Sequence, residues 1–308
     1  MYEGLSSPNI YTPKSLYEYS LTALQVPDAT IWAGGTFIMT RPDAYPCKTA
    51  NSEIIYIGGI EELDRFQRND RLAELGSRIT FHKILNSGKT ILPKLLIDNA
   101  KIIESSLISQ RATIGGAICT KELTTSFPGT LIALNAAVEV KYIKKKRIHS
   151  KWLPLSRLVD KNGRIALPPQ GMISRIRIST IEDDIQKFYA VGSFILEPSD
   201  AVSVAFISDW DMDLLINPHI TITLPQLGIC FSRDIDNVLA SLRFPLDESE
   251  YNSLESILFT FLDSSISEIS ELQKARVRGI LENLFDDLNR KALEHPQDKE
   301  NHELRSST

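Results

Sequence analysis

Two glycine stretches have the residue types and spacing needed to bind an anion. They are Ala33–Thr36 and Thr113–Gly116, about 80 residues apart. Glycine has no Cβ, so the backbone can adopt positive φ and its N–H groups can come close to a ligand. Successive N–H groups in such a turn form a concave site for an anion, typically a phosphate. Together the two stretches could clasp one diphosphate from both sides.

Both stretches also have a purely structural interpretation, because paired glycines serve any tight turn. A third pair, Gly58-Gly59, is best explained as the end of a strand before a turn. The histidines are scattered, and the cysteine near the second stretch, Cys119, is better explained as a buried apolar side chain. The sequence therefore singles out no acid, base or nucleophile, and the expected chemistry is binding through the main chain.

The composition is that of an ordinary globular protein. The chain has 308 residues, 43% hydrophobic and 24% charged, and a formal net charge of −5, which argues against a broad nucleic-acid surface. No apolar run reaches the roughly 18 residues of a membrane helix, and the N-terminus lacks a signal-peptide pattern. The three cysteines, Cys47, Cys119 and Cys230, lie too far apart for a metal or iron–sulfur site. Their low, odd number predicts a reducing, cytoplasmic location.

Capping signals and apolar runs predict the elements that position the glycine stretches. Ser15 and Glu18 form a predicted capping box for a helix over 13–24, with Leu24 on its apolar face. Thr80 is predicted to cap a helix that begins near residue 81. The second glycine stretch is expected to be part of a strand-like apolar run. Other elements expected in this half are a helix over 93–106 and strands over 30–32 and 54–57.

The second half of the chain is expected to form antiparallel strands followed by long amphipathic helices. The strands are expected over 137–142, 172–178, 201–207 and 220–224, and the helices over 234–242, 247–262 and 266–288. The basic run Lys144–Lys151 is best explained as a solvated hairpin tip. Contact with an acidic partner subunit is the alternative.

The two glycine motifs resemble those of one known family. Arg111–Gly116 reads RATIGG and Ala33–Thr36 reads AGGT. Both motifs, at this separation, are similar to those of the FAD-binding medium subunits of molybdenum hydroxylases, of the xanthine dehydrogenase and carbon monoxide dehydrogenase type. Asp200–Ala205 also resembles the strand that opens the family's C-terminal domain. The resemblance covers residues 8–291, nearly the whole chain.

This resemblance implies an α+β protein with the PCMH-type FAD-binding fold. Two α/β subdomains would enclose FAD, and a third subdomain would combine an antiparallel sheet with helices. The expected FAD-binding subdomains are 1–55 and 56–180. A carbon monoxide dehydrogenase flavoprotein-like C-terminal domain is expected over 181–291, followed by a polar, disordered tail over 292–308.

The resemblance also implies what the chain binds. The glycine stretches would hold the FAD diphosphate mainly through backbone N–H groups, and the chain would transfer electrons rather than oxidise a substrate. Electrons would come from the [2Fe–2S] clusters of a small subunit, beside a large molybdopterin-binding subunit, and pass through FAD to NAD or another acceptor. The residues implied at the cofactor are Ala33, Gly34, Gly35, Thr36, Phe37, Thr113, Ile114, Gly115, Gly116, Ser126, Ile173 and Lys187.

The chain departs from the family pattern at three positions. Ala117 stands where Asn is usual, Ser126 where an acidic residue is usual, and Phe37 where a polar residue is common. A lost hydrogen bond that leaves its partner unsatisfied costs about 1–3 kcal/mol. FAD binding is still the favoured expectation because the backbone sites remain. The alternatives are a flavin-free structural subunit of the same fold and, less well supported, a free-standing flavin oxidase.

Overall fold

The computed structural model describes residues 8–40, 53–88, 91–103, 105–120, 123–145, 147–194, 196–266 and 268–294. Its contacts divide the chain into two compact units that interleave along the sequence. The first unit is Met1–Glu122, Asn135–Asp160 and Ile165–Ile181, and the second is Leu123–Leu134, Lys161–Arg164 and Glu182–Thr308. The boundary expected near residue 55 lies inside the first unit, and all the expected subdomain limits stay predictions.

A small parallel sheet opens the first unit. Its strands lie in the order β1-β3-β2, with both pairs parallel. The elements are β1 (Asn9–Tyr11), α1 (Leu16–Gln25), β2 (Thr30–Trp32), the short 3-10 turn η1 (Ile38–Thr40) and β3 (Glu53–Tyr56). The predicted strand over 30–32 is confirmed, and the one over 54–57 is shifted by one residue.

Helix α1 forms where its capping residue predicts. The N–H group of Glu18 donates to Ser15 Oγ at 3.1 Å, but the Glu18 carboxylate accepts from Lys14 N–H rather than closing a capping box on Ser15. Tyr19 and Ala23, each 4% exposed, pack into the core beside β3. The prediction that Leu24 lies on the apolar face is wrong, since this side chain is 37% exposed.

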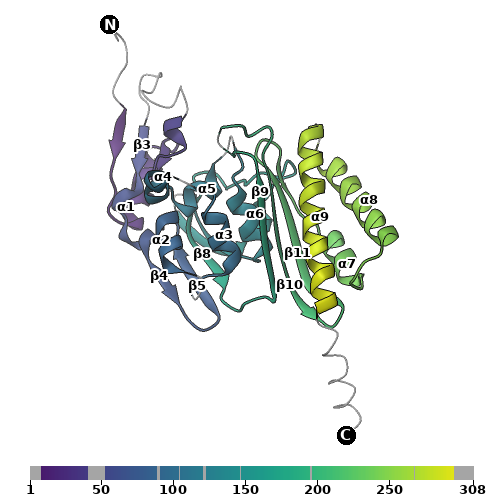
Figure 1. The fold of residues 1–308 in the computed structure, drawn as a ribbon. Helices are drawn as coiled ribbons and strands as arrows, with labels where there is room; N and C mark the ends of the chain where they lie inside the picture. Colours follow the sequence, from purple (N-terminus) through teal and green to yellow (C-terminus); the bar gives the residue numbers. More distant parts are fainter. Residues whose placement is uncertain are drawn as a thin grey trace. The chain divides into compact units, whose positions relative to one another are not determined.

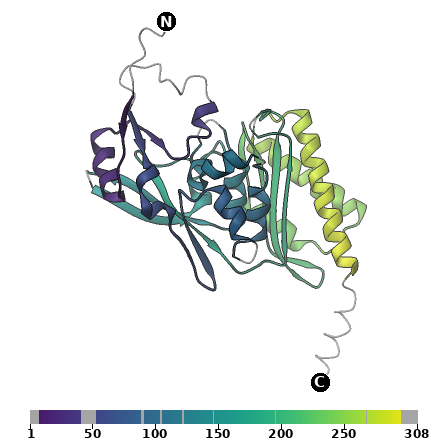
Figure 2. The ribbon, with the colours of Figure 1, turned by 60° about the vertical axis from the view of Figure 1, so that its left-hand side comes forward.

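A five-stranded antiparallel sheet forms the rest of the first unit, in the order β4-β5-β8-β6-β7. In Figure 2 the β4–β5 hairpin, in blue, extends from one edge of this sheet. The strands are β4 (Phe66–Arg68), β5 (Leu72–Gly76), β6 (Ala137–Lys144), β7 (Arg147–Pro154) and β8 (Met172–Ser179). The 3-10 turns of this part are η2 (Ile57–Gly59), η3 (Glu61–Asp64) and η4 (Leu155–Leu158).

Four short helices follow β5 in the sequence (Figure 1). They are α2 (Phe81–Ser87), α3 (Lys94–Ala100), α4 (Ser106–Arg111) and α5 (Ile114–Cys119). The predicted cap of α2 is confirmed, because Thr80 Oγ1 accepts from Lys83 N–H at 3.3 Å. The single helix predicted over 93–106 is wrong. Within that range the structure has α3, which ends at Ala100, and α4 begins only at Ser106.

Glu139 is a buried carboxylate in this sheet, with a side chain only 5% exposed. It accepts hydrogen bonds from Arg175 Nε at 2.7 Å, and from Ser150 Oγ and Ser174 Oγ at 2.5 Å each. Burial alone would raise the pKa of Glu139, but these hydrogen bonds outweigh burial and hold the pKa well below its usual range. Arg175 also pairs with Glu74, so one network joins β5, β8, β6 and β7.

We expect Glu139→Gln to lower the free energy of unfolding at pH 7 by about 1–3 kcal/mol, the cost of a lost hydrogen bond to a charged group. The native pKa is depressed, so the ionised Glu139 stabilises the fold fully above its unfolded pKa of about 4.3, and this stabilisation is lost as the pH falls through the native value. Urea unfolding of both proteins between pH 7 and pH 3 measures the difference. A difference that stays constant below pH 4 would contradict this account.

The second unit is built on a four-stranded antiparallel sheet in the order β12-β11-β10-β9. Its strands are β9 (Ile185–Val191), β10 (Val202–Asp211), β11 (Leu214–Leu224) and β12 (Gly228–Cys230). Its helices are α6 (Ser126–Ala133), α7 (Arg233–Ser241), α8 (Glu248–Ser265) and α9 (Glu271–Glu294). Helix α6 contacts β10 and β11, where Thr221 Oγ1 donates to the carbonyl of Gly129 at 3.0 Å.

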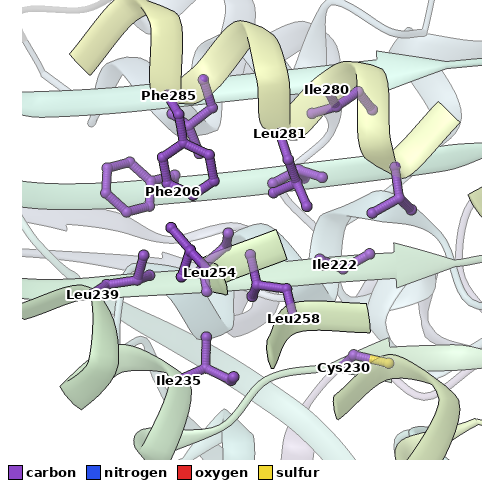
Figure 3. Close-up of a cluster of buried hydrophobic side chains, with 14 of the residues drawn as sticks. Phe206, Ile222, Cys230, Ile235, Leu239, Leu254, Leu258, Ile280, Leu281 and Phe285 are labelled. Atoms are coloured by element: carbon purple, nitrogen blue, oxygen red, sulfur yellow. The ribbon is translucent and has the colours of Figure 1, made fainter. Parts of the chain in front are cut away.

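The core of the second unit lies between the sheet and helices α7, α8 and α9 (Figures 1 and 3). Figure 3 shows Phe206 of β10 beside Phe285 of α9, with Leu254 of α8 below them. All three side chains are at most 1% exposed. Helix α9 continues to Glu294, so the expected disordered tail does not begin at 292, and residues 295–308 lie outside the described residues.

Truncation of this core should be costly. We expect Phe206→Ala to lower the free energy of unfolding by about 3–5 kcal/mol, because it leaves a cavity at a fully buried site. Leu196→Ala is the control, since Leu196 is 84% exposed and its loss should change stability by less than about 0.5 kcal/mol. Urea denaturation followed by circular dichroism compares the two. Equal effects would show that the core is not packed as described.

Candidate functional site

The first glycine stretch leaves the carboxyl end of β2, in a parallel sheet. Ligands of open sheets with parallel strands bind at this end of the strands. Gly35 has φ +73°, a conformation that favours glycine, and a Cβ at this position would also collide with the Trp32 indole. The carbonyl of Gly35 then accepts from Met39 N–H at 2.9 Å, which closes the turn into η1.

The N–H groups of this stretch are available to a ligand. Among the described residues, no backbone or side-chain acceptor receives the N–H of Gly34, Gly35, Thr36 or Phe37. These residues are also partly exposed to solvent. Four successive free donors on a glycine turn are the arrangement that binds a phosphate through the main chain.

The second glycine stretch differs from its prediction. It is the first turn of α5 rather than part of a strand, and Thr113 is its N-cap. The N–H groups of this turn already donate within the chain. Ile114 donates to Ile79 O at 3.0 Å and Gly115 to Ser77 O at 2.8 Å. Gly116 donates to Thr113 Oγ1 at 3.1 Å, and Ala117 to Thr113 O at 3.0 Å. This turn therefore offers no free N–H group from residues 114–117.

The structure brings the two stretches into contact through the main chain. A Cβ on Gly34 would overlap the carbonyl oxygen of Arg111, the residue that ends α4 and opens the second motif. A Cβ on Gly115 would lie 2.7 Å from Ser77 Cβ and 2.8 Å from Ser77 O. Both glycines are thus required by close backbone packing, whether or not a ligand is present.

Ile173 is connected to the second stretch by hydrogen bonds between backbones. It lies in β8 and is 3% exposed. The next carbonyl along β8, of Ser174, accepts from Ser77 N–H at 3.0 Å, and Ser77 O in turn accepts from Gly115. Ile173 is therefore a buried residue of a strand that contacts α5, and a contact between its side chain and a cofactor stays a prediction.

Ser126 and Lys187 belong to the second unit. Ser126 is the first residue of α6 and is 7% exposed. Lys187 lies on β9, and its Nζ is 2.5 Å from Asp287 Oδ2 of α9. Tyr189 OH donates to the same oxygen at 3.1 Å. The hydrogen bond from Lys187 holds the pKa of Asp287 below its usual value. Lys187 is thus already paired with a carboxylate, and its predicted role at the flavin stays untested.

Sequence reasoning missed the supporting roles of two residues, Ser77 and Arg111, although Arg111 opens the second motif. Ser77 and Arg111 act through carbonyl oxygens, which every residue carries, so no side-chain pattern could have found them. Ser77 is 4% exposed, and its Oγ has no hydrogen-bond partner in the described structure. Across the described residues, no group of His, Cys, Asp and Glu side chains could hold a metal ion. No helix in that part of the chain has the length and apolar character needed to cross a membrane.

We expect Gly34→Ala to destabilise the first unit by several kcal/mol, because its Cβ would have to displace the Arg111 main chain. Gly279→Ala is the matched control. It lies within α9 with open space around it, so alanine should stabilise the helix by about 0.5–1 kcal/mol. Thermal unfolding of both variants tests the contact. A Gly34→Ala protein as stable as the parent would show that the two stretches do not touch.

The sequence matches one family profile, described as the FAD binding domain in molybdopterin dehydrogenase, over residues 5–180. Among curated proteins, no sequence matches the chain. Several solved structures share its fold. Quinoline 2-oxidoreductase from Pseudomonas putida 86 aligns with a TM-score of 0.70 at 14% identity, covering 94% of this chain and 99% of the other.

Two carbon monoxide dehydrogenases are similar to the same extent. The enzyme from Hydrogenophaga pseudoflava aligns with a TM-score of 0.70 at 16% identity, over 93% of each chain. The enzyme from Oligotropha carboxidovorans aligns with a TM-score of 0.70 at 16% identity, over 92% of this chain and 96% of the other. These matches confirm the predicted α+β, PCMH-type fold. Since the family profile covers more than half of the sequence, the chain belongs to the family of FAD binding domains of molybdopterin dehydrogenases.

Proposed function

We propose that the first glycine stretch holds the diphosphate of FAD and that this chain is the flavin subunit of a molybdopterin-dependent dehydrogenase complex. The observation that carries the proposal is that the N–H groups of Gly34, Gly35, Thr36 and Phe37, at the carboxyl end of β2, have no acceptor among the described residues. Their number and partial exposure suit the two phosphates of the family's cofactor.

Only one of the two predicted glycine stretches has N–H groups that suit a diphosphate. Residues 34–37 fit a diphosphate, whereas residues 114–117 have no N–H group left to offer. The second stretch instead supports the first, because the Arg111 carbonyl packs against Gly34. Gly115 and Gly116 then act as packing positions, and the Thr113 hydroxyl serves α5 as its N-cap.

The chain's own residues bind and orient the cofactor. FAD, when bound, supplies the capacity to accept and release electrons. The positive φ of Gly35 and the 3-10 turn η1 define the turn that carries these main-chain donors. The Thr36 hydroxyl adds a donor at the same turn. None of these proposed contacts involves a proton transfer.

The proposed complex follows the family. A small subunit with [2Fe–2S] clusters would be the electron donor, a large subunit would hold the molybdopterin, and NAD or another molecule would be the acceptor. The few cysteines support a cytoplasmic complex. A flavin-free structural subunit of the same fold is the second candidate. It is favoured by one observation, the fully engaged N–H groups of the second stretch.

The flavin content and one substitution test the proposal. The purified chain, incubated with FAD and desalted, should show flavin absorbance and release about one FAD per chain on heating. We expect Thr36→Asp to weaken FAD binding by at least about tenfold, or 1.4 kcal/mol, because its carboxylate would repel the phosphates. Fluorescence titration measures both affinities.

Thr36→Val is the matched control. It removes the hydroxyl but keeps the N–H group, so it should bind FAD within about threefold of the parent if the main chain supplies most of the contact. Circular dichroism should be the same for both variants. A folded parent chain that stays colourless with excess FAD would refute the proposal and leave the structural subunit. Equal binding by Thr36→Asp and the parent would move the site away from this turn.

A further inference from the structure

The β6–β7 hairpin concentrates positive charge on an acidic protein. The two strands pair along their whole length, from Ala137 opposite Pro154 to Lys144 opposite Arg147. Lys144, Lys145, Arg147 and Lys151 are all exposed. We call these four residues the basic tip. In Figure 2 the teal hairpin extends to the left of the view. The chain as a whole carries a net charge of −5, so this local charge is opposite in sign.

The basic tip has no acidic partner within the described residues. None of its four side chains forms an ion pair there. Nearby cations on the same sheet are paired instead. Lys141 Nζ is 3.3 Å from Glu139 Oε1, and Arg177 pairs with Glu74 at 2.8 Å. The positive charge of the basic tip is therefore not neutralised by carboxylates of the described residues.

Two features of the basic tip destabilise the β6–β7 hairpin. Lys145 has φ +52°, the left-handed region, which is unfavourable for residues other than glycine, asparagine and aspartate. Two-residue hairpin turns strongly prefer Asn-Gly or Asp-Gly at such positions. Lys144 and Arg147 stand directly opposite each other, and like charges in this arrangement repel. No described contact compensates for either cost.

An aromatic residue lies further down the same hairpin. Two guanidinium groups of β8 lie over the ring of Trp152 in β7, with Arg177 Cζ 4.0 Å and Arg175 Cζ 5.3 Å from the ring centroid. Ile148, between Arg147 and Trp152, is 43% exposed. Tryptophan and arginine are enriched in protein interfaces relative to the rest of a protein surface.

We propose that the basic tip is a docking site for an acidic segment of a partner protein. Carboxylates of that segment would pair with Lys144, Lys145, Arg147 and Lys151, and would relieve the repulsion between Lys144 and Arg147. The proposal stands on the hairpin alone and does not depend on flavin binding. A protein partner is preferred to nucleic acid because the net charge of the chain is negative, which disfavours a polyanion that spans a wide surface.

A labelled poly-L-glutamate peptide is the probe. The full chain should bind it at low salt, and affinity should fall as added salt screens the charges. Lys144→Glu/Lys145→Glu/Arg147→Glu should weaken binding by at least about tenfold. Arg65→Glu/Arg68→Glu/Arg71→Glu is the matched control. It reverses three exposed cations on the β4–β5 hairpin of the same sheet and should bind like the parent.

Three outcomes would overturn the proposal. One is equal loss of binding in both triple variants, which would mean general electrostatics. Another is tighter binding of duplex DNA or of phosphatidylserine vesicles than of the peptide in competition. The third is self-association of the parent chain through the basic tip. Sedimentation would show it as an oligomer of the parent that is lost in the Lys144→Glu/Lys145→Glu/Arg147→Glu variant.

Lys145→Gly separates docking from a merely structural role. Glycine accepts φ +52°, so the melting temperature should rise by about 2 °C. Binding of the peptide should fall by about threefold, because one cation is lost. A rise in melting temperature with unchanged binding would overturn the assignment of Lys145 to the docking site.

Discussion

The close approach of two backbones, at Gly34 and Arg111, is the contact on which the candidate site depends. Gly34 has room only for a hydrogen atom beside the Arg111 carbonyl. This contact joins the loop after β2 to the end of α4, two segments far apart in the sequence. Ser77 connects the second stretch to the sheet. Its N–H donates to the carbonyl of Ser174 in β8, and its carbonyl accepts from the N–H of Gly115 in α5. The first stretch thus packs against the second, while its N–H groups at residues 34–37 have no acceptor among the described residues.

The same packing explains why glycine motifs alone cannot distinguish a flavin subunit from a flavin-free relative. Gly34 and Gly115 are required by backbone contacts, and Gly35 by its positive φ, even without a ligand. A flavin subunit differs from a flavin-free relative in whether the N–H groups of the glycine stretches are left available to a ligand. Those of residues 34–37 are free within the described structure, and those of 114–117 are used. The proposed phosphate site is therefore the first stretch alone.

Local signals in the sequence predicted local structure well. The caps of α1 and α2 depend on Ser15 and Thr80, whose hydroxyls act three residues away. The fold class followed from two motifs and is confirmed. The second glycine stretch is a helical turn rather than the expected strand-like run. Its local signal is Thr113, whose hydroxyl caps α5 as Thr80 caps α2. The carbonyls of residues 77 and 79, which accept from Gly115 and Ile114, carry no such signal. The pairing of Lys187 with Asp287 joins residues 100 positions apart, so neither neighbourhood could reveal it.

The most direct test of the account is an NMR titration of the chain, labelled with 15N-glycine, against FAD. The 15 glycines give few enough signals to assign by substitution. The account predicts that the amide signals of Gly34 and Gly35 shift strongly as FAD binds, while those of Gly115 and Gly116, already hydrogen-bonded, move little. Large shifts at Gly115 and Gly116 with none at Gly34 and Gly35 would contradict it.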